Sequence, residues 1–398
     1  MTETPSQRIA PPAFLSDPGL ATIMAALPEA RVVGGAVRDA LAGRAVADID
    51  LATPRRPLAV IQALEDARIR AVPTGLDHGT VTAVVGGQGV EITTLRRDVE
   101  TDGRHAVVAF TEDWRADAAR RDFTINALSL ARDGSVFDYF GGIEDLRAQR
   151  VRFVGDPRTR IAEDYLRVLR FFRFFARYGG GSPDRVTLAA LREAVPGLAG
   201  LSVERVWSEL KRILGAPDPS RAIELMGALG VLDAVLPEGT DRARLLRLVA
   251  SGAPTDALLR LAALLTGDVA AVADRLRLSK DERVRLAELR AGPVPGPSDD
   301  DATVRRMLAD NEPQVLIDRA WLAGDDGVDW VALRTRLAAM ARPVFALEGR
   351  DVVALGVAPG PRIGELLRDV RRWWLAAGCV PDRAACLAEL GRRVGESG

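Results

Sequence analysis

The chain has 398 residues, of which 47% are hydrophobic and 27% charged, and its formal net charge is −1. This composition is that of a globular protein, and the absence of an apolar run of about 18 residues excludes a membrane-spanning helix. Because the length exceeds that of one ordinary domain, we expect about two to four domains. Only His78 and His105 are histidines, which excludes a histidine-rich metal site.

The cysteines and the first residues of the chain bear on its location. Cys379 and Cys386 fit no metal-binding spacing, so a reducing, cytoplasmic location is the simplest interpretation. The start, MTETPSQRIAPPAF, has no basic region followed by an apolar segment, so we expect no secretion signal.

The first half of the chain has the pattern of a mixed α/β domain. Apolar residues at helical spacing alternate there with short β-branched runs bounded by glycine and proline. In chain order, the predicted elements are a helix over 20–27, a strand over 31–33, a helix over 36–41, a strand carrying two aspartates, a helix over 57–68 and a hairpin over 79–96.

A glycine pair, Gly34 and Gly35, separates the first strand from the following helix. Glycine lets backbone N–H groups approach a ligand closely, and a helix N-terminus favours phosphate. Arg38, one turn into the helix, could reach such a phosphate or pair with a neighbouring carboxylate. Most glycine pairs before a helix are simple turns, so this pair gains weight only from the segment that follows it.

That segment carries Asp48 and Asp50, separated by one residue in a strand-like stretch. Side chains at i and i+2 of a strand point to the same face, so the two carboxylates should lie side by side while Ile49 and Leu51 point into a core. Mg²⁺ would relieve their repulsion, because it prefers carboxylate oxygens and keeps positions open for phosphates. Two solvated aspartates on a surface strand are the alternative.

The segment RRDFTINALSL, 120–130, combines charge with short hydrogen-bonding side chains. Arg121 brings positive charge beside Asp122, and Asn126 adds an amide. We interpret the segment as a helix start, with Asp122 or Thr124 as its cap and the later apolar residues in a core. A helix start is also a suitable place to bind ribose and phosphates.

From Val151 onward the chain is rich in Leu, Ala and Arg at helical spacing, with Gly- and Pro-rich joints. We therefore expect an α/β head followed by a mostly helical body. The segment 201–214 has the pattern of an amphipathic helix, and the joint 291–301 is the strongest candidate for a linker.

The segment TRIAEDYLRVLRFFRFFARYG, 159–179, has the pattern of one helix with Glu163, Asp164, Arg167 and Arg170 on its polar face. A surface ion pair between Asp164 and Arg167, worth less than roughly 1 kcal/mol, is the plain interpretation. Base recognition is the functional one. Cytosine and adenine each present an amino donor beside a ring-nitrogen acceptor, which suits an accepting Asp and a donating Arg. Uracil and guanine present the reverse order and would leave buried polar groups unpaired.

Several motifs together resemble one family. GGAVRD, DID, HGTVT with VEITTLRRD, TDGRH and RRDFTINA are similar to the head of the class II tRNA nucleotidyltransferase and bacterial poly(A) polymerase superfamily, and the similarity continues through 160–177 and more loosely to the C-terminus. The resemblance implies an α+β fold with a polymerase-β-like nucleotidyltransferase head and an all-helical neck, body and tail. The implied boundaries are 1–148 for the head, 149–215 for the neck with its base-selecting helix, 216–345 for the body and 346–398 for the tail.

The resemblance also implies the chemistry of the head. Asp48 and Asp50 would hold two Mg²⁺ ions, one activating the RNA 3′-hydroxyl and the other binding the triphosphate. Glu91 is the candidate for a third catalytic carboxylate, with an exposed strand glutamate as the alternative. Arg104, in TDGRH, would lie in a mobile loop that closes over substrate.

In the neck, E-D-x-x-R is similar to the motif with which CCA-adding enzymes read the incoming base. Asp164 and Arg167 would then select C or A, Glu163 would orient Arg167, and Asp122 would contact the ribose 2′-hydroxyl. The implied nucleotide-binding residues are Gly34, Gly35, Arg38, Arg121, Asp122, Asn126, Glu163, Asp164, Arg167 and Arg170.

The segment 347–378 resembles the tail with which the family holds the tRNA elbow. Arg371 and Arg372 are its candidate RNA-binding residues, and core packing of the adjacent Trp373 and Trp374 is the alternative interpretation of this segment. Phosphate contacts there would make RNA binding salt-dependent.

The resemblance implies template-independent addition of C, C and A to the 3′ end of tRNA, from CTP and ATP, with release of pyrophosphate. A poly(A) polymerase and a partial CC- or A-adding enzyme stay open as alternatives, and so does a catalytically silent RNA-binding protein, against which Asp48 and Asp50 argue. The implied partners are tRNA, through its acceptor end and elbow, CTP and ATP, with no membrane and no obligate protein partner.

Overall fold

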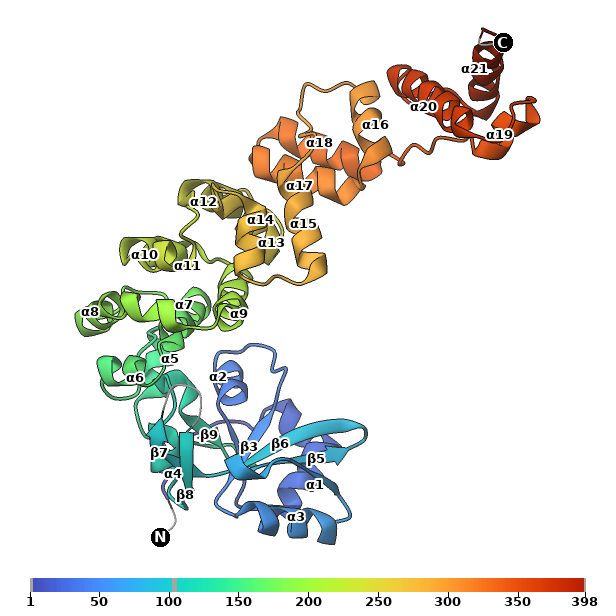
Figure 1. Ribbon diagram of the computed structural model, residues 1–398. Helices are drawn as coiled ribbons and strands as arrows, with labels where there is room; N and C mark the ends of the chain where they lie inside the picture. Colours follow the sequence, from blue (N-terminus) through green and yellow to red (C-terminus); the bar gives the residue numbers. More distant parts are fainter. Residues whose placement is uncertain (1–2, 102–105, 397–398) are drawn as a thin grey trace. The chain divides into compact units, whose positions relative to one another are not determined.

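The computed structural model of the protein describes residues 3–101 and 106–396. The chain divides into two compact units, Met1–Pro237 and Glu238–Gly398 (Figure 1). Arg104, for which we predict a loop that closes over substrate, lies outside the described residues. The finer division into head, neck, body and tail stays a prediction.

The first unit contains a mixed sheet with the strand order β1-β10-β9-β2-β3-β6-β5-β4. Neighbouring strands are antiparallel, except that β3 and β6 run parallel. A separate pair, β7 and β8, is antiparallel. The bounds are β1 Gln7–Arg8, β2 Arg31–Val33, β3 Asp50–Thr53, β4 Arg70–Gly75, β5 Thr80–Val85, β6 Gln88–Thr94, β7 Arg96–Thr101, β8 Ala106–Phe110, β9 Leu128–Leu130 and β10 Ser135–Asp138.

The early helices of the first unit lie beside the sheet, and the later ones extend away from it (Figure 1). Their bounds are α1 Pro18–Ala26, α2 Gly35–Leu41, α3 Pro57–Asp66, α4 Trp114–Ala119, α5 Gly142–Arg147, α6 Pro157–Glu163, α7 Leu166–Tyr178, α8 Arg185–Glu193, α9 Val203–Leu214, α10 Ser220–Ala228 and α11 Val231–Val235. This mixed sheet followed by helices confirms the predicted α+β class.

The strands send alternate side chains into cores on the two faces of the sheet. Leu51 is fully buried in the larger core, against which Ile49 packs, as the alternation predicts. Ala52 lies on the opposite face, in a small core with Trp114 of α4. Asp50 shares that second face with Ala52 because the two are separated by one residue, but it is exposed. The sheet therefore carries an uncovered carboxylate where its second core ends.

Aromatic side chains join the sheet to α7. Phe123, from the loop after α4, has its ring centroid 4.8 Å from that of Phe153 and 5.2 Å from that of Phe174. Phe171 stacks on Phe153 at 6.0 Å, and these four rings are buried. Such clusters combine apolar burial with favourable ring geometry. They fix α7 beside Asp122, the neighbour of Phe123.

The prediction of one helix over 159–179 is wrong, because the chain breaks at Asp164 into α6 and α7. Asp164 is extended, with φ −159° and ψ 108°, and its Oδ1 accepts the N–H of Leu166 at 3.1 Å. A side chain that captures a backbone donor in this way competes with helix continuation. The apolar spacing is the same on both sides of the break, so periodicity alone does not reveal it.

The predicted helix start in 120–130 is also wrong. A short 3₁₀ turn, Thr124–Asn126, leads directly into β9. All three residues of β9 are buried, because it pairs with both β2 and β10. Membership in a central strand therefore overrides the local capping signal.

The second unit is helical throughout its described residues. Its bounds are α12 Arg242–Ala250, α13 Ala257–Leu264, α14 Val269–Arg275, α15 Lys280–Arg290, α16 Asp301–Asp310, α17 Pro313–Ala323, α18 Val328–Ala339, α19 Gly349–Ala354, α20 Pro361–Ala376 and α21 Arg383–Glu396. The predicted linker 291–301 is instead a loop inside this unit, where the Arg319 guanidinium donates to the Pro293 carbonyl at 3.1 Å. Across the described part of the chain, no helix has the length and apolar character to span a bilayer.

Candidate active site

A cleft of about 630 Å³ lies in the first unit, where α2, the first part of the 120–130 segment and α7 meet. It gathers many of the residues that the sequence indicates, although these are spread over more than a hundred positions of the chain. Those that line it are Gly34, Gly35, Arg38, Asp50, Arg121, Asp122, Asn126 and Arg170.

Asp50 is the first residue of β3 and lies opposite Glu91 of the parallel strand β6. Although Asp50 is open to solvent, the surrounding protein atoms partly desolvate it and raise its pKa; repulsion from the carboxylates of Glu91 and Asp48 raises the pKa further, and Arg121 opposes the rise. The three carboxylates are therefore near neighbours. The prediction that Asp48 lies within the strand is wrong, since β3 begins at Asp50 and Asp48 is in the loop just before it.

This carboxylate group fits a magnesium site that is completed by substrate. Within residues 3–101 and 106–396, no three His, Cys, Asp or Glu side chains converge into a ready-made metal cage. Mg²⁺ usually takes one or two protein carboxylates and fills its remaining positions with water and substrate phosphates. Asp48 and Asp50 supply the oxygen donors that such an ion prefers.

The floor of the cleft is a continuous chain of polar contacts. Arg38 donates to Asn126 Oδ1 at 2.5 Å, Asn126 donates to Asp122 Oδ1 at 3.0 Å, and Arg170 Nε donates to Asp122 Oδ2 at 2.7 Å. Burial by itself would raise the pKa of Asp122, but Arg170 and the hydrogen bond from Asn126 lower it below its usual value. Asp122 is therefore an anion, and its partners hold the floor rigid.

Gly34 is required by the backbone at the mouth of the cleft. Its φ is +67°, which side chains on an L residue rarely allow, and an added Cβ would lie 3.0 Å from Arg121 Nη1. Arg121 therefore lies directly against the backbone at the start of α2. The glycine pair thus does more than form a turn.

The predicted base-reading residues lie outside the cleft lining. Asp164 Oδ2 accepts from Arg205 of α9 at 2.6 Å, and the carboxylate of Glu163 accepts from Arg160 at 2.9 Å and from Arg167. The surface ion pair between Asp164 and Arg167 is absent from the described structure, so that plain interpretation is wrong. The contact between Glu163 and Arg167 is the one that the E-D-x-x-R motif implies.

Asp164 nevertheless adjoins the cleft through Arg170. Burial lowers the pKa of Arg170, but Asp122 and Asp164, among the nearby carboxylates, outweigh that effect and raise it. Arg170 thus binds Asp122 on the cleft floor directly and interacts with Asp164, just before α7, only through its charge.

Sequence reasoning missed Arg173, Arg177, Tyr178 and Arg212, which also line the cleft. The first two follow Arg170 at i+3 and i+7, so one face of α7 carries all three arginines, and this spacing is a signal that the sequence contained. Tyr178 had no comparable signal, because its role depends on residues that are distant in the chain.

Tyr178 ties α7 to the end of α2. Its hydroxyl donates to Asp39, and its ring is contacted by the guanidinium groups of Arg38, at 4.5 Å, and Arg44, at 4.6 Å. This side chain fixes the position of the loop that leads from α2 towards Asp48.

We expect Tyr178→Phe to lower the free energy of unfolding by about 1 kcal/mol, because it removes one charge-assisted hydrogen bond from a buried ring. Urea denaturation of the whole chain measures this change. Tyr165→Phe is the matched control, since the Tyr165 side chain is 37% exposed and makes no hydrogen bond to described residues. Equal stability of the two variants would contradict a tying role for Tyr178.

The predicted RNA-binding arginines of the second unit lie on α20. Arg371 pairs with Asp310 at the end of α16, whereas the side chain of Arg372 is 80% exposed and lies 3.3 Å from Asp369. Trp374 is buried, and its indole N–H donates to the Pro381 carbonyl at 3.1 Å, so it belongs to the core. Of the two candidate arginines, Arg372 is therefore the more exposed.

Comparison with known proteins identifies the family of the chain. Residues 30–152 match the Poly A polymerase head domain, and residues 182–242 match the probable RNA and SrmB-binding site of polymerase A. The chain is 38% identical to CCA tRNA nucleotidyltransferase 1, mitochondrial, from Danio rerio over 363 residues, covering 87% of this chain and 83% of that protein. The chain belongs to the CCA-adding tRNA nucleotidyltransferase family. The corresponding Homo sapiens protein is also 38% identical, over 91% of this chain and 86% of its own length.

Bacterial members of the CCA-adding family match over a similar share of the chain. The CCA-adding enzyme of Streptococcus sanguinis is 33% identical over 92% of this chain and 93% of its own length. The crystal structure of the Bacillus stearothermophilus CCA-adding enzyme in complex with CTP covers 96% of this chain and 99% of its own, with 27% identity and a TM-score of 0.76. As a member of this family the chain is a nucleotidyltransferase, which rules out the catalytically silent RNA-binding protein considered from the sequence.

Proposed function

We propose that this protein adds C, C and A to the 3′ end of tRNA without a nucleic-acid template, using CTP and ATP and releasing pyrophosphate. The observation that carries the proposal is the position of Asp50, beside Glu91 and near Asp48, at the edge of a cleft lined with arginines. Carboxylates suit divalent cations, and guanidinium groups suit a triphosphate. The printed names of the relatives supply the substrate, because they are CCA tRNA nucleotidyltransferases and CCA-adding enzymes.

Two Mg²⁺ ions would be held by Asp48 and Asp50, with Glu91 as the candidate for a third catalytic carboxylate. When bound, such ions favour deprotonation of the RNA 3′-hydroxyl and neutralise the triphosphate and the departing pyrophosphate. The raised pKa of Asp50 supports this assignment, because adjacent anions at one strand edge are unfavourable until a cation joins them.

The chain's own residues position the nucleotide. Gly34 and Gly35 offer a close backbone approach at the start of α2, and Arg121 lies beside them to pair with phosphate. Asp122, held by Asn126 on the cleft floor, would accept from the ribose 2′-hydroxyl and so favour ribonucleotides over deoxyribonucleotides. These contacts are common to CTP and ATP and leave base selection to other groups.

Base selection is assigned to Asp164 and Arg167. Arg167 would donate to the ring nitrogen of C or A while Asp164 accepts from the amino group, and Glu163 holds Arg167 in place. Because Asp164 pairs with Arg205 and Arg167 lies off the cleft lining, both side chains must turn towards the cleft when the base arrives. Uracil or guanine would leave these groups unpaired.

The remaining proposals concern location and the second unit. Both cysteines are free thiols, which fits a reducing, cytoplasmic compartment. Arg371 and Arg372 are assigned to contact the tRNA elbow, and the exposure of Arg372 supports this. Removal of a phosphate contact would lower the salt dependence of tRNA binding.

The decisive assay supplies purified protein and Mg²⁺ with a tRNA that lacks its 3′ end. Nucleoside triphosphates are added singly and then all four together, and products are resolved at single-nucleotide length. We expect two C and then one A, with no extension by UTP or GTP. Long A tails on unrelated RNA would establish a poly(A) polymerase instead, and products that stop at CC, or grow only by A, would establish a partial enzyme.

A further inference from the structure

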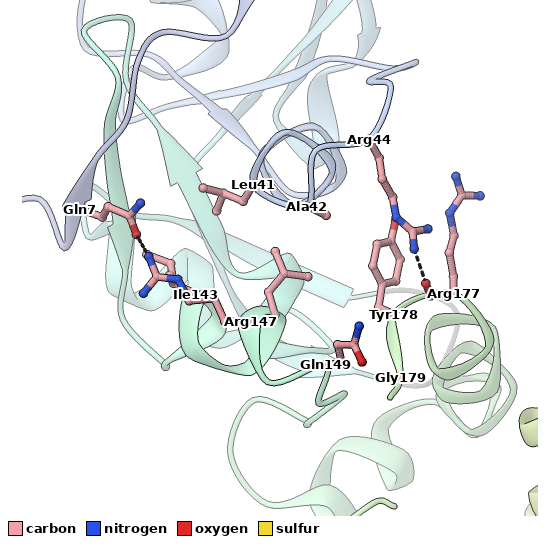
Figure 2. A pocket seen from close by; sticks show the side chains of 11 residues that line it. Gln7, Leu41, Ala42, Arg44, Ile143, Arg147, Gln149, Arg177, Tyr178 and Gly179 are labelled. Atoms are coloured by element: carbon pink, nitrogen blue, oxygen red, sulfur yellow. Dashed lines mark hydrogen bonds between the residues drawn. The ribbon is translucent and has the colours of Figure 1, made fainter. Parts of the chain in front are cut away.

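A second cavity, of about 300 Å³, lies in the first unit (Figure 2). It is bounded by the loop after α2, by α5 and by the end of α7, and we call it the α5 pocket. Arg177 and Tyr178 line both the α5 pocket and the cleft, so the two are neighbours. The reaction as described above uses no residue that is particular to this pocket.

The α5 pocket gathers uncompensated positive charge. Arg44, Arg147 and Arg177 line it, and no acidic residue is among its lining residues in the described part of the chain. None of the three makes an ion pair with any residue that the structure describes. Along the same face of α7, by contrast, Arg170 pairs with Asp122 at 2.5 Å. The guanidinium groups nearer the base-reading residues are thus neutralised, whereas those of the pocket are not.

Neutral contacts hold two of these arginines in place. Arg44 donates to the backbone carbonyl of Arg177 at 2.7 Å and stacks on the Tyr178 ring, and Arg147 donates to Gln7 Oε1 at 2.5 Å (Figure 2). A guanidinium carries five N–H donors, so each retains donors for a ligand. A fork of this kind matches phosphate oxygens in geometry and charge. The chemistry of the pocket is therefore that of a phosphate site.

The position of the pocket favours a phosphate of RNA over a free anion. Arg170 and Arg177 are seven residues apart on α7, which is about 10 Å of helix. Stacked nucleotides rise about 3.4 Å each, so this distance corresponds to about three nucleotides. A strand whose 3′ end reacts in the cleft has to leave it, and the shared wall of Arg177 and Tyr178 leads directly to the pocket.

We propose that the α5 pocket holds a backbone phosphate of the RNA substrate, a few nucleotides before its reacting 3′ end. This inference rests on the proposed function and adds to it a strand contact centred on Arg147, with Arg44 and Arg177 on the other side of the pocket (Figure 2). Arg147 is the sharpest probe because it is exposed and lines the pocket but not the cleft.

The test measures binding of tRNA lacking its 3′ CCA to the full chain, without nucleotide, by fluorescence anisotropy over a series of salt concentrations. Arg147→Gln should weaken binding about tenfold, as expected for loss of one charge-assisted contact. It should also reduce the slope of log affinity against log salt by about 0.7 to 0.9. Arg147→Lys, which keeps the charge, should restore the slope and most of the affinity.

Arg132→Gln is the matched control, since Arg132 is exposed in the turn before β10, away from the pocket, and has no ion pair in the described structure. Thermal unfolding of all variants should coincide, because none of these side chains is buried. Binding by Arg147→Gln that equals binding by Arg132→Gln would overturn the proposal.

A calorimetric titration with inorganic pyrophosphate distinguishes the source of the phosphate. Loss of a pyrophosphate site in Arg147→Gln, with tRNA affinity unchanged, would establish a free-anion site and overturn the RNA assignment. The proposed function is judged separately, by C, C and A addition with the unmodified protein, so its failure cannot be confused with failure of this inference.

Discussion

Replacing Asp50 by asparagine is expected to lower the rate of C addition about a thousandfold or more, which corresponds to about 4 kcal/mol in the activation free energy. The substitution keeps the size of the side chain and removes the charge that a magnesium ion needs. We expect no other side chain to replace this metal ligand, because Asp50 is the carboxylate at the start of β3 that faces the cleft. Single-turnover addition of one C to tRNA lacking its 3′ end measures the effect.

The loss can be separated from unfolding. Because burial and the charges of Glu91 and Asp48 raise the pKa of Asp50, its ionised form is disfavoured in the folded protein. Removal of that charge at neutral pH should therefore leave the free energy of unfolding unchanged or raise it, and tRNA binding should persist. Asp66→Asn, at the end of α3, is the matched control and should react at the normal rate. Near-normal turnover by Asp50→Asn would exclude a metal role for this carboxylate.

The sequence predicts the parts of the site that depend on local alternation. Ile49 and Leu51 enter one core and thereby turn Asp50 to the other face. The hairpin prediction was also sufficient to bring Glu91 onto a strand, and the two glycines Gly86 and Gly87, both with positive φ, form its turn. What the pattern could not supply is the parallel pairing of β3 and β6, because register between distant strands leaves no trace in either segment alone.

Contacts between distant segments explain the remaining misses. The helix break at Asp164 depends on a side chain that accepts the backbone N–H of Leu166 and pairs with Arg205, 41 positions away. The polar floor joins Asp122 to Arg170 across 48 positions. Amphipathic spacing records which residues face a core, but it does not record which polar partners meet. The residues that belong to local motifs were therefore predictable, whereas most partners from distant segments were not.

Replacing Arg167 by alanine is expected to reduce the preference for CTP over UTP, expressed as the ratio of the two kcat/KM values, by about a hundredfold or more. Sites that read hydrogen-bond patterns reject the wrong pattern strongly because it leaves buried groups unpaired, and truncation removes the group that would be left unpaired. The effect should come mostly from slower use of CTP. Competition between CTP and UTP for the same tRNA, read at the first added nucleotide, measures the ratio directly.

Two further variants make that result specific. Arg158→Ala is the control, because Arg158 lies in the preceding helix α6 and pairs with Glu193 at 2.7 Å. Its loss should leave the ratio unchanged. Glu163→Gln keeps Arg167 but weakens the contact that orients it, so it should lower the ratio by less than Arg167→Ala does. If selectivity survives in Arg167→Ala, the base is read elsewhere, and the contacts of Glu163 and Arg167 with each other serve only to join α6 to α7. If selectivity falls in that order, the ion pair between Glu163 and Arg167, which lies outside the cleft lining, determines which base the enzyme accepts.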